Sequence, residues 1–277
     1  MLSIIRADLF RIFRSKGIYI TIGALLVLMI LHLSGDLTRN IGIWIEPTDL
    51  IKDTVFTSDP VVSHSVNNPQ ILTGFDAARR ALFSVKDLFP FFLTIIIFVC
   101  GADFSSNTIK IIIASGKSRT RHYFAKLILS VLASLSLVLV FVTGIGLVYT
   151  TINGFGTSTA DQWSLFIRSL LSQLFFIAGV AAFGAFLSFV TQKASLIMGF
   201  LMAYYLLPAL VLFAIFGQSD ADMGMITSLD VSFVLTKLAY IDAFPVKEVL
   251  GAFAHGTILL IGGTAAGLAL FSKSDIK

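Results

Sequence analysis

Residues 127–149, LILSVLASLSLVLVFVTGIGLVY, decide the class of this fold. The stretch contains no charged side chain, and about 20 consecutive apolar residues in a helix are enough to cross the hydrocarbon core of a bilayer. The whole chain has the same character, because 56% of its 277 residues are hydrophobic and only 13% are charged. A soluble domain carries roughly 25% charged residues. The sequence therefore predicts an all-α polytopic membrane protein.

Other apolar runs predict that residues 1–277 form one transmembrane domain with six transmembrane helices. The predicted spans are residues 18–33, 88–102, 127–149, 169–190, 194–216 and 249–271. Pro90 interrupts the second span. Pro208 predicts a kink in the fifth, where neighbouring helices can satisfy the carbonyl that proline leaves free.

The distribution of charge predicts the orientation. Twelve Lys and Arg but only three Asp fall in one set of segments, which gives a net charge of +9, whereas the remainder has a net charge of −5. The basic set comprises residues 1–17, 103–126, 191–193 and 272–277. Basic segments stay in the cytoplasm. Both termini and loop 103–126 are therefore predicted to be cytoplasmic, and residues 34–87 and 217–248 extracellular.

Residues 1–16 precede the first span and have two distinct faces in a helix. The apolar face contains Leu2, Ile5, Leu9, Ile12 and Phe13. The polar face contains Ser3, Asp8, Arg11 and Arg14. A basic amphipathic helix of this kind lies in the membrane interface, although a frayed beginning of the first span would carry similar residues.

The two predicted extracellular segments are not uniform. At the end of the first, residues 74–89, GFDAARRALFSVKDLF, read as an amphipathic helix that leads into the second span. Residues 217–248 mix acidic side chains with apolar patches. This pattern fits short helices that dip part-way into the membrane, and it also fits an ordinary ordered loop.

The cytoplasmic loop contains Gly116-Lys117-Ser118, which are the last three residues of a nucleotide-binding P-loop motif. That motif also needs a glycine five residues earlier, where the backbone curls around the phosphates, but this chain has Ile111 there. We therefore expect no nucleotide binding by the loop. Its apolar stretch, TIKIIIAS (residues 108–115), predicts instead a short helix at the inner surface that contacts lipid or a protein groove.

The N-terminal helix, the six spans and the loop after the second span resemble the permease subunits of type-two ABC exporters. Many members carry an acidic-aromatic-x-x-Gly-Thr signature after the second span, followed by a helix and a Ser-Arg-like segment. In DFSSNTIKIIIASGKSR, residues 103–119, the matching positions are Asp103, Phe104, Thr108, Ser115, Gly116, Ser118 and Arg119. Asn107 stands where the signature has glycine.

The resemblance implies that residues 105–116 form a coupling helix that docks on a separate cytoplasmic ABC ATPase. Residues 1–16 would then be the connecting helix, and residues 217–248 would contain paired re-entrant helices. The chain itself would not be an enzyme and would bind no cofactor, because ATP and Mg²⁺ would bind to the partner. Two permeases, as a homodimer or a mixed pair, would work with two ATPases in a bacterial plasma membrane. The residues expected to couple the permease to the ATPase are Asp103, Phe104, Thr108, Lys110, Ile112, Ser115, Gly116 and Arg119.

The substrate is inferred from the character of the spans. The chain contains 26 Phe, and an apolar, aromatic pathway would suit export of an amphipathic peptide or hydrophobic compound, including an antimicrobial peptide; Phe side chains that face lipid would give the same composition. His255 lies well inside a predicted span, either as a candidate pathway residue or as a packing residue. A secondary transporter or channel would show charged residues in mid-span, and an intramembrane enzyme would show clustered acids or histidines. Neither pattern is present.

Overall fold

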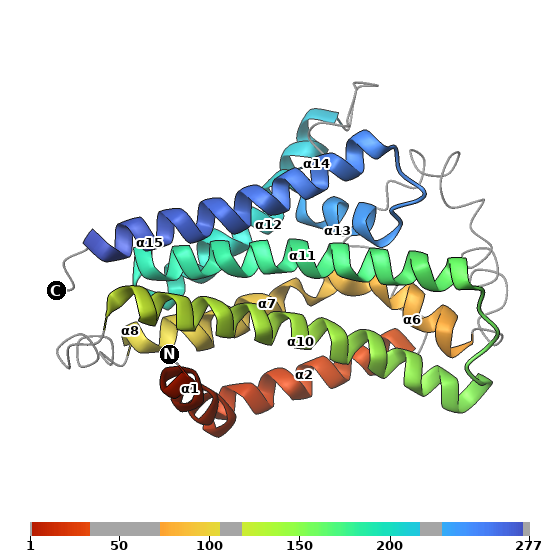
Figure 1. The fold of residues 1–277 in the computed structure, drawn as a ribbon, viewed down its shortest axis with the longest axis horizontal. Helices are drawn as coiled ribbons and strands as arrows, with labels where there is room; N and C mark the ends of the chain where they lie inside the picture. Colours follow the sequence, from red (N-terminus) through yellow and green to blue (C-terminus); the bar gives the residue numbers. More distant parts are fainter. Residues whose placement is uncertain (1, 34–72, 106–117, 217–228, 274–277) are drawn as a thin grey trace.

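The computed structural model describes residues 2–33, 73–105, 118–216 and 229–273, and within these ranges the regular elements are all helical (Figure 1). The α-helices are α1 (Leu2–Arg14), α2 (Lys16–Leu33), α6 (Gly74–Phe83), α7 (Phe89–Ile96), α8 (Ala102–Ser105), α10 (Arg119–Asn153), α11 (Ala160–Thr191), α12 (Ala194–Phe216), α13 (Val231–Ala239), α14 (Val246–Thr257) and α15 (Gly263–Lys273). They form an elongated bundle, and α15 ends at the same end of the bundle as α1 and α8.

Several helical segments are long enough to cross a membrane, so the chain is a multi-pass membrane protein. Among the described residues there are 5 such segments: Lys16–Leu33, Gly74–Gly101, Arg119–Asn153, Ala160–Thr191 and Val246–Ser272. The remaining apolar helix, α12, contains Pro208, and its apolar part up to that proline is the shorter segment Ala194–Pro208. The count of six spans and the orientation in the membrane stay predictions.

Helix α11 lies in the middle of the bundle, between α10 on one side and α14 and α15 on the other. Two glycines allow this close packing. A Cβ atom on Gly179 would lie 2.6 Å from the carbonyl oxygen of Gly256, and one on Gly263 would lie 3.0 Å from the Cα of Phe183. The first distance is too short for a Cβ atom and the second is tighter than most Cβ contacts, so a side chain at either position would push α11 and the last span apart.

Replacing Gly179 with alanine should therefore destabilise the protein by about 1–3 kcal/mol, the usual cost of overpacking. The effect can be measured as a lower midpoint of thermal unfolding in mild detergent. The matched control is Gly199→Ala in α12, because a Cβ there would meet nothing within 4 Å. Equal midpoints for the two variants would contradict the close approach of α11 and α14.

The second candidate span begins at Gly74, earlier than the predicted start at Leu88. Thr73 caps α6 by accepting a hydrogen bond from the Asp76 amide, and the apolar side of α6 is buried in the bundle core against α10. A 3₁₀ turn, η2 (Ser84–Leu88), joins α6 to α7. Pro90 lies in the first turn of α7, where its missing N–H costs no hydrogen bond within the helix.

A buried glutamine supports the break between α6 and α7. The Gln173 amide donates hydrogen bonds to the carbonyl of Leu82, at 2.8 Å, and to the carbonyl of Leu235 in α13, at 2.9 Å. Because Gln173 is fully buried, these bonds satisfy main-chain groups that have no access to water. One side chain of α11 thus fixes the positions of two shorter helices.

Two π-turns interrupt the candidate spans. The first, η3 (Ile97–Gly101), leads directly into α8, and the second, η4 (Ile258–Gly262), joins α14 to α15. A π-turn carries one more residue than an α-turn, and such turns are frequent at functional sites. The residues of α8, which directly follow the first π-turn, are therefore candidates for a functional site.

Helix α13 is the described part of the predicted short helices in residues 217–248. Asp230 caps it by accepting hydrogen bonds from the amides of Ser232, at 2.7 Å, and Phe233, at 3.1 Å. Lys237 Nζ lies 2.9 Å from Glu248 Oε2, which joins α13 to α14. Residues 217–228 lie outside the described ranges, so a paired re-entrant arrangement stays a prediction.

Candidate functional site

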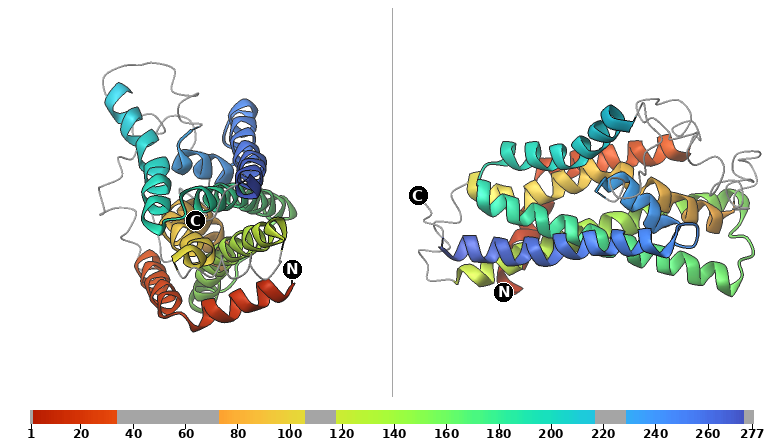
Figure 2. Two further views of the ribbon diagram at one scale, coloured as in Figure 1. Left: turned by 90° about the vertical axis from the view of Figure 1, so that its left-hand side faces the viewer. Right: turned by 90° about the horizontal axis from the view of Figure 1, so that it is seen from above.

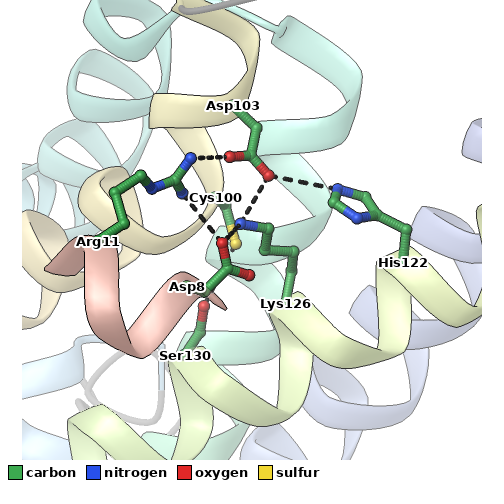
Figure 3. A network of polar contacts seen from close by, with 7 residues as sticks. All are labelled: Asp8, Arg11, Cys100, Asp103, His122, Lys126 and Ser130. Carbon is green, nitrogen blue, oxygen red and sulfur yellow. Dashed lines mark hydrogen bonds and ion pairs between the residues drawn. The ribbon is translucent and has the colours of Figure 1, made fainter. Parts of the chain in front are cut away.

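A network of charged side chains joins three helices at the end of the bundle where the cytoplasm is predicted (Figure 3). Its members are Asp8 and Arg11 of α1, Asp103 of α8, and His122 and Lys126 of α10. Helix α1 runs crosswise to the spans along one edge of the bundle, as Figure 2 (left) shows, with the spans seen end-on. The network is therefore placed where α1 meets the second and third candidate spans.

The two carboxylates of the network share two cations. Lys126 Nζ lies 2.8 Å from Asp8 Oδ1 and 2.6 Å from Asp103 Oδ2. The Arg11 guanidinium pairs with Asp103 Oδ1 through Nη1 and lies 3.3 Å from Asp8 Oδ1 through Nη2. His122 Nε2 lies 3.4 Å from Asp103 Oδ2. The side chains of Asp103, His122 and Lys126 are each only 1% exposed.

Because the network is buried, its main effect is to fix the relative positions of the helices, and its net contribution to stability is small. The carboxylates of Asp8 and Asp103 stand against the cations of Arg11 and Lys126, two negative charges against two positive ones. The attraction within such a cluster roughly repays the cost of removing its charges from water, whereas loss of one member leaves a buried charge without compensation. The ion pairs are therefore satisfied only when α1, α8 and α10 keep this mutual arrangement.

The charge state of Asp103 follows from its partners. Burial alone would raise the pKa of this carboxyl, but the close contact with His122 and the nearby cations of Lys126 and Arg11 outweigh it and hold the pKa well below its usual range. The carboxylate is thus ionised at neutral pH. Because the folded-state pKa is lowered, its contribution to stability is present above the ordinary pKa of about 4 and is lost as the pH falls below it.

A layer of aromatic rings lies beside the network. Phe104 packs edge-on against Phe189 of α11, with ring centroids 5.4 Å apart, and His122 approaches the same ring at 6.2 Å. The Tyr123 hydroxyl donates a hydrogen bond to the carbonyl of Gly263, at 3.1 Å. The first turns of α10 are thus attached to α1 on one side and to α11 and α15 on the other.

The predicted coupling residues fall into three groups. Asp103 and Phe104 lie in the network and in the aromatic layer. Arg119, which was expected to act together with Asp103, donates a hydrogen bond to the carbonyl of Phe271 in α15, at 3.5 Å. The others lie outside the described residues: Thr108, Lys110, Ile112, Ser115 and Gly116. Their role in coupling stays a prediction.

His255, the candidate pathway residue, lies away from the network. Its Nε2 atom is 2.7 Å from the Tyr204 hydroxyl of α12, and its ring packs edge-on against Phe176 of α11 at 5.4 Å. The pair therefore links α12 and α14 beside α11. A pathway role for His255 stays a prediction.

The sequence analysis did not find the partners of Asp103. It placed Asp8 and Arg11 on a polar face and counted Lys126 only as a cytoplasmic cation. A usable signal was present, because Asp8 and Asp103 are two of only three acids among twelve cations on the predicted cytoplasmic side. A rare acid next to an apolar segment is a candidate for a buried ion pair. Within the described ranges, no group of three His, Cys, Asp or Glu could hold a metal ion.

Comparison with known proteins gives one match. A family model for an ABC-2 family transporter protein matches residues 17–271. No curated protein and no solved structure matches the chain. The matched region begins after α1 and ends in α15, so it includes Asp103, His122 and Lys126 but not Asp8 or Arg11.

Proposed function

Because the chain belongs to the ABC-2 family of transporter proteins, we propose that it is the permease subunit of an ATP-driven exporter that works with a separate cytoplasmic ATPase. ATP and Mg²⁺ would then bind to that partner. We further propose that two permeases, identical or paired, assemble with two ATPases in a bacterial plasma membrane. In this arrangement the present chain supplies the pathway and the partner supplies the energy.

The observation that supports coupling is the position of the charged network relative to loop 106–117. Helix α8 ends at Ser105 and α10 begins at Arg119, so the network connects the two flanks of this loop through Asp103 and Lys126. Both flanks are also joined to α1 through Asp8 and Arg11. A force applied to the loop by an ATPase would therefore move α8, α10 and α1 as one unit and would tilt the spans that continue from them.

The proposed substrate class is an amphipathic peptide or hydrophobic compound, such as an antimicrobial peptide, moved outward. The surroundings of the Tyr204–His255 pair support this choice. Phe183 approaches Tyr204 with ring centroids 5.4 Å apart, and Phe176 packs against His255. One hydrogen-bonding pair among aromatic rings matches a ligand that is mostly apolar and has few polar groups.

The test of the proposal is co-purification. The tagged chain is expressed with the genes beside its own and purified in mild detergent. We expect an ATPase subunit to co-purify at one copy per permease. The variant Ile111→Asp, Ile112→Asp, Ile113→Asp should lose it, because three charges would disrupt an apolar docking segment. An intact, monodisperse protein that brings no ATPase from any neighbouring gene would contradict the proposal and favour a secondary transporter.

The same complex tests the substrate class. After reconstitution, amphipathic peptides should stimulate its ATP hydrolysis, whereas hydrophilic oligosaccharides should not. Stimulation by oligosaccharides alone would overturn the peptide proposal and leave the permease assignment intact.

A further inference from the structure

Helix α1 has an outer face that takes no part in the charged network. Among the residues of α1 whose burial is described, the exposed ones are Arg6, Ala7, Leu9, Phe10, Phe13 and Arg14. Phe10 and Phe13 are 65% and 63% exposed, and the Arg14 guanidinium lies 5.4 Å from the centre of the Phe10 ring. Asp8, by contrast, is buried. Asp8 and Arg11 thus face the charged network, whereas Phe10, Phe13 and Arg14 face outward.

This outer face continues into a surface that must contact lipid. Tyr19 and Ile20, in the first turns of α2, are 63% and 73% exposed, and the Tyr19 hydroxyl donates a hydrogen bond to the carbonyl of Phe13, at 2.9 Å. Helix α2 is a candidate membrane span, and only 17% of its 18 residues are buried inside the protein. The continuity of the two apolar surfaces favours the membrane over a protein groove as the partner of α1.

The charge of the outer face indicates the kind of lipid. Arg6 and Arg14 of α1 and Lys16 of α2 are exposed. At this end of the bundle, the carboxylates of the described chain belong to Asp8 and Asp103, and both are buried in ion pairs with Lys126. No exposed acid among the described residues of this end offsets the three cations. Basic side chains beside exposed aromatic rings favour anionic headgroups at the inner surface of a membrane.

We propose that the outer face of α1, with Lys16, is a binding site for anionic phospholipid of the inner leaflet. The rings of Phe10 and Phe13 enter the boundary between headgroups and acyl chains, while Arg6, Arg14 and Lys16 contact lipid phosphates. Helix α1 is then attached to lipid on its outer face and to Asp103 and Lys126 through its inner face. The charge of the surrounding lipid therefore sets how firmly α1 stays against α8 and α10.

The test uses the full chain without any ATPase, so that its outcome is independent of the exporter proposal. The protein is placed in nanodiscs of phosphatidylcholine alone, or of phosphatidylcholine with phosphatidylglycerol, and hydrogen–deuterium exchange is followed in the peptide that covers residues 2–16. Each basic side chain near an anionic surface gains roughly fivefold in binding. Three of them should slow exchange of the α1 amides by about tenfold or more in the anionic discs, and high salt should reduce the difference.

Two variants identify the site. Arg6→Gln, Arg14→Gln, Lys16→Gln should remove the difference between the two lipids. The matched control, Arg121→Gln, Lys193→Gln, removes exposed cations outside this face and should retain it. Exchange in a peptide from α11 serves as the measure of intact folding in both variants.

Three results would overturn the proposal. The first is equal exchange of the wild-type α1 in the two lipids, which needs no variant. The second is loss of the difference in both variants, which would indicate a general surface charge. The third is protection that is equal in both lipids and arises only when a partner ATPase is added, which would identify the face as a protein-docking surface.

Discussion

Replacing Lys126 with methionine is expected to lower the free energy of unfolding by about 3–5 kcal/mol, the usual cost of removing one partner from a buried ion network. The change leaves Arg11 to compensate the carboxylates of both Asp8 and Asp103, although methionine fills most of the volume of the lysine stem. The expected readout is a large fall in the thermal unfolding midpoint in detergent, together with a lower yield of monodisperse protein.

Two controls separate charge from packing. The double variant Lys126→Met, Asp8→Asn leaves Arg11 and Asp103 as a neutral pair, and it should recover most of the lost stability. Lys193→Met, at an exposed position, should change the free energy of unfolding by no more than about 0.5 kcal/mol. A double variant as unstable as the single one would mean that the lysine stem, and not the balance of charge, matters at this site.

Replacing Asp103 with asparagine is expected to uncouple ATP hydrolysis from the permease. Asparagine keeps the shape of the side chain, so the loop and its ATPase should still associate. However, Arg11 and Lys126 lose a shared negative partner, and α1 is then no longer attached electrostatically to α8. If the network carries a coupling free energy of ordinary size, substrate-stimulated ATP hydrolysis by the purified complex should fall by about tenfold.

For each variant, the stimulated rate of ATP hydrolysis must be compared with the amount of ATPase bound to the permease. Asp103→Glu keeps the charge and should retain more stimulation than Asp103→Asn. In Asp103→Asn, Lys126→Met, the ion pair of Asp8 and Arg11 remains and the buried charge is again balanced, so stability should recover. Stimulation should stay low, because α8 still has no link to α1. Full stimulation in Asp103→Asn with a normal amount of bound ATPase would show that coupling does not use this network.

The apolar helices of the bundle could be predicted because a helix that crosses a bilayer needs a long run of apolar residues, and such a run is visible in the sequence of that helix alone. The stretch at residues 127–149 lies within α10, and Pro208 lies within α12 as expected. The helix at residues 74–83 was also predicted, from its two-faced pattern, but as an extracellular helix that leads into the second span. Asp76, Arg79 and Arg80 lower the hydropathy there, so hydropathy alone does not show that this helix, with Phe75, Ala81 and Leu82 buried, belongs to the long helical segment Gly74–Gly101.

The candidate site was less accessible to sequence reasoning. Asp103 and Phe104 were identified by their place in a family motif, but a motif does not specify which distant side chains complete the site. Asp8 falls on the predicted polar face of residues 1–16 and is buried, where it pairs with Lys126. Periodicity groups the residues of one helix by face, but it does not tell which other helix a polar face will contact.

The π-turn at Ile97–Gly101 determines the direction in which the Asp103 side chain points, because it rotates the residues that follow it about the helix axis. Successive residues of an α-helix are separated by about 100° around its axis, and one additional residue in a turn shifts everything that follows by nearly that angle. In an uninterrupted α-helix, the carboxylate of residue 103 would point to a different neighbour and not toward Arg11 and Lys126. The number of residues between Leu88 and Asp103, and not only their identity, is thus part of what encodes the site. A homologue that lacked one residue there would need a different set of charged partners.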